Sequence, residues 1–220
     1  MAPADTLEGF SGIYRSGGRR ARFTSVLLGI IAFIAILSII QDGLGFGLIE
    51  DARMGLLTAG EATAYDTGVA HLATASLALV VVTAIAFLAW LSRTVDNVPA
   101  LRGGRPSVTP RWSIGWWFIP FANLVKPYQI VREVHDRMAI GASSGGDWIV
   151  LAWWVSWVPG RVISAVAELL AEPINPDAPN LDALAKLYSV RGIADSLTFV
   201  GAILAIAVVL RIQWRAEMRA

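Results

Sequence analysis

The chain has 220 residues, of which 55% are hydrophobic and 16% are charged, and its mean hydropathy is +0.59. Ordinary soluble domains are about 45–50% apolar and about 25% charged, so this composition argues against a soluble enzyme and excludes disorder. A formal net charge of +1 argues against general nucleic-acid binding. The absence of cysteine excludes disulfides, thiolate zinc sites and cysteine nucleophiles.

Four apolar stretches are long enough to be membrane helices, which need about 20 mostly apolar residues. The first is too long for the apolar core of a signal peptide and is followed by no obvious cleavage site, so we expect it to be retained. The sequence therefore predicts an all-α fold, a four-span transmembrane helix bundle of residues 23–212, with a leader of residues 1–22 and a basic tail of residues 213–220. The expected spans are about 23–40, 69–91, 148–170 and 193–210.

A fifth apolar run, 112–125, is shorter and contains Pro120 and Asn123. The distribution of Lys and Arg indicates whether this run crosses the membrane, because basic residues concentrate on the cytoplasmic side of membrane proteins. With four spans, the two termini and the connection 92–147 share one side, and together they hold most of the 18 Lys and Arg residues. We therefore expect both termini in the cytoplasm and the run 112–125 as a proline-broken re-entrant or interfacial element on the inner face.

The residues after this run predict an amphipathic helix over 127–140. Its apolar side chains recur at helical spacing on one face, and charged side chains occupy the other. We expect this helix to lie along the inner membrane surface, so that 112–140 forms one inner-face element. The apolar face consists of Ile130, Val131, Val134 and Met138.

The junction of the second span with the inner-face element carries a distinctive pattern. Its order and spacing resemble the bacterial membrane family called domain of unknown function 4328, most densely over 86–135 and weakly over 23–212. The resemblance implies a multi-span protein of the bacterial inner membrane and implies no activity. The matching residues are Trp90, Leu91, Ser92, Arg93, Asn97, Pro110, Trp112, the run 116–124, Pro127, Tyr128, Gln129, Val131, Arg132 and Glu133.

The inner-face motif supports two interpretations. In the functional interpretation, the motif is a binding site for an anionic lipid headgroup, a ligand or a partner. It offers backbone carbonyls freed by the prolines, the amide of Asn123 and basic side chains. In the structural interpretation, the tryptophans of the motif anchor it at the membrane–water interface and Asn123 caps the broken backbone. Its basic residues then only reflect the preference of Lys and Arg for the cytoplasmic side. The candidate residues are Arg93, Asn97, Trp112, Trp116, Trp117, Pro120, Asn123, Lys126, Pro127, Tyr128 and Arg132.

The third span carries a cluster of aromatic side chains, Trp153, Trp154 and Trp157. Trp153 and Trp157 share a helix face because they are four residues apart. They are interpreted either as bundle packing, the commoner role of tryptophan in such folds, or as a stacking surface for a flat ligand such as a quinone or pigment ring.

Arg161 lies near the middle of the third span, where a charge costs at least about 2.5–3.5 kcal/mol. We expect it to face the bundle interior and to have a partner. Glu168, Asp195 and His71 lie at comparable depth in the outer half, so the four residues could line one outward-facing polar pocket. Alternatively, an Arg161–Asp195 pair simply holds two helices together.

No catalytic signature occurs, because the nucleophile elbow, the P-loop, the zincin motif and the dinucleotide fingerprint are all absent from the sequence. We therefore expect no enzyme, no metal and no cofactor. The sequence predicts a non-enzymatic accessory or scaffolding protein of the cytoplasmic membrane, which contacts lipid and forms a homo-oligomer or joins a larger complex. The alternative is a small-molecule or lipid binding or transport protein that uses the pocket around Arg161.

Overall fold

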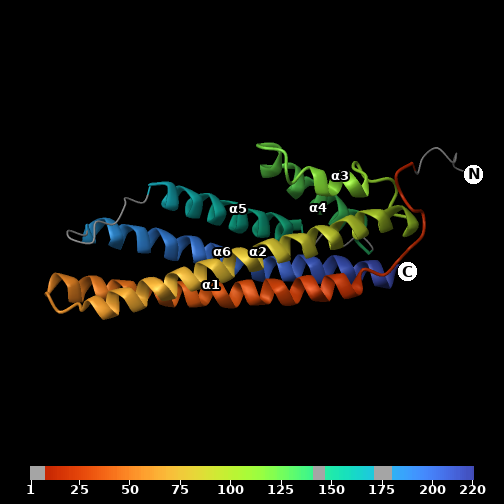
Figure 1. The fold of residues 1–220 in the computed structure, drawn as a ribbon. Helices are drawn as coiled ribbons and strands as arrows, with labels where there is room; N and C mark the ends of the chain where they lie inside the picture. The colour runs from red at the N-terminus through yellow and green to blue at the C-terminus, as the bar shows by residue number, and fades with distance from the viewer. Residues whose placement is uncertain (1–7, 141–146, 171–179) are drawn as a thin grey trace, which may run out of the picture. The chain divides into compact units, whose positions relative to one another are not determined.

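The structure is a computed structural model that describes residues 8–140, 147–170 and 180–220. Every regular element in this part of the chain is a helix, and four helices are long and apolar enough to span a membrane, which confirms the predicted fold class (Figure 1). The elements are α1 (Gly18–Arg53), α2 (Ala59–Ala100), α3 (Pro110–Gly115), the 3₁₀ helix η2 (Ala122–Leu124), α4 (Lys126–Arg137), α5 (Asp147–Leu170) and α6 (Leu181–Met218).

Three of the long helices extend well past the predicted spans. α1, α2 and α6 contain 36, 42 and 38 residues. At 1.5 Å per residue, α2 is about 63 Å long, roughly twice the thickness of a bilayer's hydrocarbon core. The apolar run marks only the part of a helix that suits lipid, and each of these helices continues through more polar residues beyond that run.

Contacts divide the chain into two compact units. Among the described residues, unit 1 comprises those up to Gly29, Val81–Trp154 and Ile203–Ala220, and unit 2 comprises Ile30–Val80 and Val155–Ala202. Each of the four long helices therefore contributes one segment to each unit, and α3, η2 and α4 belong to unit 1 alone.

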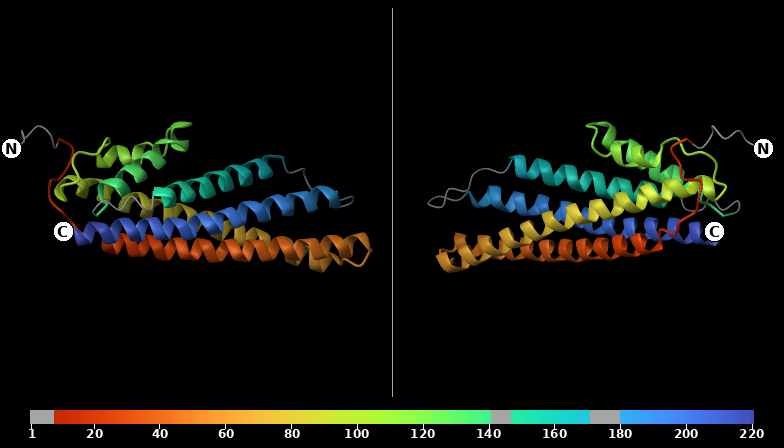
Figure 2. Two further views of the ribbon diagram at one scale, coloured as in Figure 1. Left: turned by 180° about the vertical axis from the view of Figure 1, so that it is seen from behind. Right: turned by 45° about the vertical axis from the view of Figure 1, so that its right-hand side comes forward.

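Unit 1 has an apolar core to which α2, α4 and α6 contribute. In both views of Figure 2, α3, η2 and α4 lie beside the C-terminal part of α2. The four apolar residues expected on one face of α4, Ile130, Val131, Val134 and Met138, are at most 2% exposed. The amphipathic pattern is thus confirmed, and protein covers the apolar face.

Residues of the predicted leader and of the basic tail also pack into unit 1. Asn97 of α2 accepts a hydrogen bond from the backbone N–H of Arg15 at 3.1 Å and donates one to the Arg15 carbonyl at 2.9 Å. At the other end of the chain, Arg219 donates to the carbonyls of Arg137 and Ala139, just after α4. The leader is therefore tied to α2, and the basic tail is tied to the end of α4.

Unit 2 depends on small residues where its helices approach one another. A Cβ at Gly160 of α5 would lie 3.1 Å from Cβ of Leu197, and one at Gly201 of α6 would lie 3.3 Å from the backbone of Trp157. Glycine at these positions lets α5 and α6 pack backbone to backbone, which is a common device in membrane helices.

Candidate functional site

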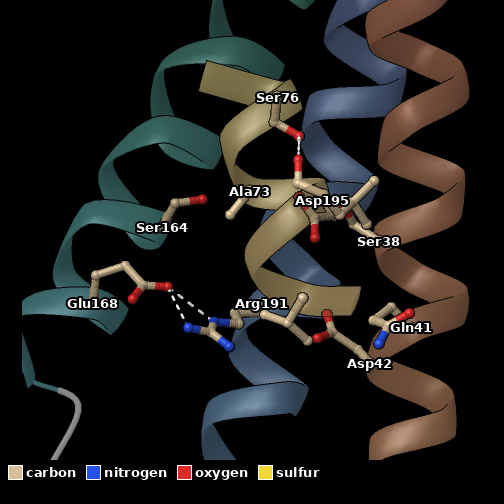
Figure 3. Close-up of a pocket in the computed structure, with 11 residues that line it drawn as sticks. Ser38, Gln41, Asp42, Ala73, Ser76, Ser164, Glu168, Arg191 and Asp195 are labelled. Atoms are coloured by element: carbon tan, nitrogen blue, oxygen red, sulfur yellow. Dashed lines mark hydrogen bonds and ion pairs between the residues drawn. The ribbon is translucent and has the colours of Figure 1, made fainter. Parts of the chain in front are cut away.

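A cavity of about 200 Å³ lies among the four helix segments of unit 2 (Figure 3). Asp42 of α1, Glu168 of α5, and Arg191 and Asp195 of α6 supply its ionisable groups. Hydroxyl and amide groups from α1, α2 and α5 add further polar surface, and the remaining wall is an apolar strip of α2. These further lining residues are Ser38, Gln41, Ser76, Ser164, Val69, Leu72 and Ala73.

Helical periodicity explains how these residues come to face one space. Side chains three, four or seven positions apart lie on the same face of a helix. Each of the four helices presents such a stripe to the cavity. The stripes are Ser38, Gln41 and Asp42 on α1, Val69, Leu72, Ala73 and Ser76 on α2, Ser164 and Glu168 on α5, and Arg191 and Asp195 on α6.

The charges in the cavity do not balance. Arg191 donates to Oε1 of Glu168 from both Nη2, at 2.7 Å, and Nε, at 2.9 Å (Figure 3). Asp42 is only 8% exposed, and its Oδ2 is buried without a hydrogen-bond partner among the described residues. Asp195 is half-buried, and no described residue gives its carboxylate a hydrogen bond or ion pair. The cavity therefore has an excess of carboxylate groups.

Two of the four residues predicted for an intramembrane pocket line this cavity, namely Glu168 and Asp195. His71 is exposed and does not line it. Arg161 is also exposed, so the expectation that it faces the interior is wrong, and the described residues show no ion pair between it and Asp195. The neighbouring Gly160, by contrast, is buried where α5 approaches α6.

Two residues that the sequence analysis did not select, Asp42 and Arg191, complete the ionisable set. A signal for each exists in the sequence. Asp42 ends the first apolar run, and Arg191 precedes Asp195 by one helical turn, so that both share a face. Among the residues that the structure describes, no group of three or more His, Cys, Asp or Glu side chains is arranged to hold a metal ion.

The predicted aromatic face is divided between the two units. In unit 1, Trp153 and Trp154 are buried and pack against Phe87 and Trp117, with ring centroids 5.3 to 6.0 Å apart. Trp154 also donates from Nε1 to the carbonyl of Leu124 at 3.0 Å. These two tryptophans therefore pack unit 1, whereas the backbone of Trp157 lies against Gly201 in unit 2.

The polar residues of the inner-face motif mostly make local contacts in unit 1. Arg93 forms an ion pair with Asp96 at 3.4 Å, and Asn97 holds the leader as described above. The expectation that Asn123 caps the broken backbone is wrong, because Phe121 occupies the position before η2 and no side chain provides a capping hydrogen bond there.

The other motif residues surround a chain reversal between α3 and α4. Trp112 and Pro120 are exposed, and Trp112 packs on Trp116 with ring centroids 5.6 Å apart. Lys126 lies over the Trp116 ring, 5.5 Å from its centroid. Pro127 is buried in the first turn of α4, and exposed Arg132 donates to the Tyr128 hydroxyl at 3.3 Å.

A comparison with family models gives one match. The family, described as domain of unknown function (DUF4328), matches residues 53–214. The matched region includes the whole inner-face element and the cavity residues on α2, α5 and α6, but not Asp42. No curated protein and no solved structure matches the chain. Because the match covers well over half of the sequence, the chain belongs to the family called domain of unknown function 4328.

Proposed function

We propose that this protein binds a small organic cation, such as a protonated alkylamine, in the cavity of unit 2. One observation carries the proposal: Asp42 is almost completely buried at the cavity, and its Oδ2 has no hydrogen-bond partner among the described residues. A buried polar atom without a partner is costly, so its presence calls for a ligand or ordered water that supplies the missing bond. A cation does so most strongly.

The lining of the cavity supports a cation over an anion. Arg191 is already engaged by Glu168, which leaves the carboxylates of Asp42 and Asp195 to set the charge of the space. The volume of about 200 Å³ is below that of sites for drug-sized ligands, which are about 300–1,000 Å³. Val69, Leu72 and Ala73 offer an apolar wall to a short alkyl chain. An ammonium group with a small apolar tail suits this combination.

The setting that we propose is the bacterial cytoplasmic membrane, with both termini in the cytoplasm and the cavity in the outer half. The apolar lengths of α1, α2, α5 and α6 support a membrane location. The concentration of Lys and Arg near the termini and between α2 and α5 supports this orientation. The role that we propose is binding or transport without catalysis.

Calorimetric titration of the full-length protein in lipid nanodiscs tests the ligand class. The panel contains methylammonium, butylammonium, tetramethylammonium and guanidinium chlorides, with sodium acetate and sodium butyrate as matched anions. We expect an ammonium ion to bind, and Asp42→Asn and Asp195→Asn each to weaken its binding about tenfold or more. Asp66→Asn is the matched control, because Asp66 is an exposed carboxylate on α2 outside the cavity.

Two results would overturn the proposal: no ammonium ion binds, or Asp42→Asn binds the ammonium ion as tightly as the unmodified chain. Unfolding midpoints of the variants, measured without ligand, show whether each variant is still folded. Replacing a buried, unpartnered carboxylate with an amide should not destabilise the protein, so a loss of binding by Asp42→Asn is attributable to the site.

A second candidate function, an accessory subunit or scaffold, is favoured by one observation. Arg161 is exposed on α5 within a helix that is apolar enough to span a membrane. A charge facing lipid is expensive, so burial against a second copy or another membrane protein would stabilise it. Native mass spectrometry from mild detergent should then show an oligomer or complex that Arg161→Leu dissociates, whereas a monomer under several detergents would exclude this role.

A further inference from the structure

The turn between α3 and α4 exposes an unusual concentration of apolar side chains. Phe118 is 73% exposed and Phe121 is 86% exposed, and Leu124 and Val125 are each about half exposed. These four residues belong to a segment of ten, 116–125, which we call the tip. Trp117 of the tip packs against Phe87 and Trp154, whereas the four exposed side chains lie outside the core of unit 1. The exposed apolar surface of the tip is therefore available to something other than the rest of unit 1.

The backbone of the tip holds these side chains outward. Phe121 has a φ of +62°, in the region that favours glycine and that an aromatic residue rarely occupies. Such conformations persist only where the surrounding structure imposes them. Pro120 directly before Phe121 and Pro127 in the first turn of α4 restrict the chain on both sides. The result is a fixed reversal with Phe121 at its most exposed point.

The polar backbone of the tip is largely paired, as an apolar environment requires. The N–H groups of Asn123 and Val125 bond to the carbonyls of Ile119 and Ala122 at 2.9 and 3.1 Å. The Leu124 carbonyl accepts a hydrogen bond from Trp154 Nε1. The tip can therefore leave water without losing these hydrogen bonds.

Trp154 also fixes the level of the tip along α5. It lies seven residues after Asp147, the first residue of α5, which corresponds to about 10 Å along the helix. The ring of Trp117 lies 6.0 Å from the ring of Trp154. Nearby on α5, Leu151 is an exposed apolar residue of a helix that is apolar enough to span a membrane. The tip thus lies at the same position along the α5 axis as exposed apolar side chains of α5 itself.

The charges beside the tip favour a lipid leaflet over a polar protein surface. Residues 111–127 contain no Asp or Glu, and their charged members, Arg111 and Lys126, are both basic and exposed. Lys126 lies over the Trp116 ring, and lysine commonly reaches a headgroup while its stem and an aromatic neighbour remain in apolar surroundings. Anionic headgroups complement this arrangement.

We propose that the tip is a shallow membrane wedge. It inserts Phe118 and Phe121 into the acyl region of the leaflet nearest the α5 N-terminus, while Arg111 and Lys126 contact the phosphates of anionic lipids. With Asp147 taken as the level of the membrane surface, the distance of about 10 Å to Trp154 agrees with the 5–10 Å by which interfacial helices bury their apolar faces. The wedge gives this leaflet a contact that the four long helices do not provide, and it is independent of the cavity in unit 2.

Site-directed spin labelling tests the wedge directly, because the chain has no cysteine to remove. Nitroxide labels on Phe118→Cys and Phe121→Cys are measured by power saturation in vesicles of phosphatidylcholine and phosphatidylglycerol. Both side chains are largely exposed, so the substitutions leave the core of unit 1 intact. We expect both labels to be more accessible to oxygen than to a water-soluble nickel chelate, as is a label at Leu151, and the reverse for a label at exposed Arg132.

Two outcomes would overturn the proposal. Accessibility at Phe121 equal to that at Arg132 would place the tip in water. Protection of Phe121 from both reagents would show that a second copy or a partner protein covers it. The headgroup contact has its own test: Lys126→Gln should reduce the depth of the Phe121 label in phosphatidylglycerol vesicles and change it little in pure phosphatidylcholine. An equal effect in both lipids would exclude an anionic headgroup contact.

Discussion

Arg215 of α6 donates a hydrogen bond from Nη1 to Nε2 of His135 in α4, at 3.0 Å, and both side chains are at most 4% exposed. Because arginine can only donate, His135 Nε2 must be the acceptor, and the ring is neutral with its proton on Nδ1. That proton points to Oδ1 of Asp136, 3.2 Å away. Arg215 also donates to the His135 carbonyl at 3.1 Å, so one guanidinium fastens the end of α4 to α6.

Loss of this guanidinium should destabilise unit 1. Arg215→Met removes both bonds and leaves His135 Nε2 and its carbonyl buried without those donors, so we expect the free energy of unfolding to fall by about 3 kcal/mol. Thermal unfolding of the purified protein in detergent measures the effect. Arg132→Met is the matched control, since Arg132 is half exposed and should matter little. Equal midpoints for the two variants would contradict the prediction.

The same histidine should make stability depend on pH. The pKa of His135 is lowered from 6.5, chiefly by burial and further by the charge of Arg215, with the Asp136 hydrogen bond opposing them. The unfolded chain therefore takes up a proton at a higher pH than the folded chain does. The resulting stabilisation is complete above about pH 6.5 and is lost as the pH falls from there toward the pKa of the folded state.

A comparison with His135→Gln isolates this effect, because glutamine can still accept a bond from Arg215 but does not titrate near neutrality. Unfolding midpoints measured from about pH 8 down to about pH 5 should fall more steeply for the unmodified chain than for the variant. Parallel profiles would show that His135 does not contribute.

Asn97 should control how firmly the leader is held. Asn97→Ala removes the two hydrogen bonds to Arg15, so hydrogen exchange of residues 11–17 should accelerate about tenfold, while the core of α2 changes little. Asn123→Ala is the matched control from the same motif, because the Asn123 side chain provides no capping hydrogen bond to η2. Equal acceleration in both variants would show that the leader is held by other contacts.

Three glycines on α1 provide a graded test of packing in unit 2. A Cβ at Gly45 would lie 2.6 and 2.9 Å from ring atoms of Tyr188, whereas nothing lies within 4 Å of a Cβ at Gly43 or Gly47. Gly45→Ala should therefore destabilise the protein by about 1–3 kcal/mol. Gly43→Ala and Gly47→Ala should be neutral or stabilising by up to about 1 kcal/mol, because alanine favours the helix. Unfolding midpoints rank the three variants, and equal values would mean that Gly45 has free space.

Part of the candidate site could be predicted from the sequence. Glu168 and Asp195 stood out because ionisable groups in apolar helices are rare, and both line the cavity. Arg161 stood out for the same reason but is exposed. Which side of α5 faces its neighbours depends on contacts with residues that are far away in the sequence, such as the approach of Leu197 of α6 to Gly160.

The sequence by itself determined the helical class, the four apolar helices and the family. Apolar length and helical periodicity are local properties that survive without knowledge of the neighbours. Only the tertiary structure decided that protein covers the apolar face of α4, that Asp42 and Arg191 share a cavity with Glu168 and Asp195, and that Phe121 is exposed. Each of these depends on contacts between helix segments distant in the chain, and periodicity identifies a face without specifying what packs against it.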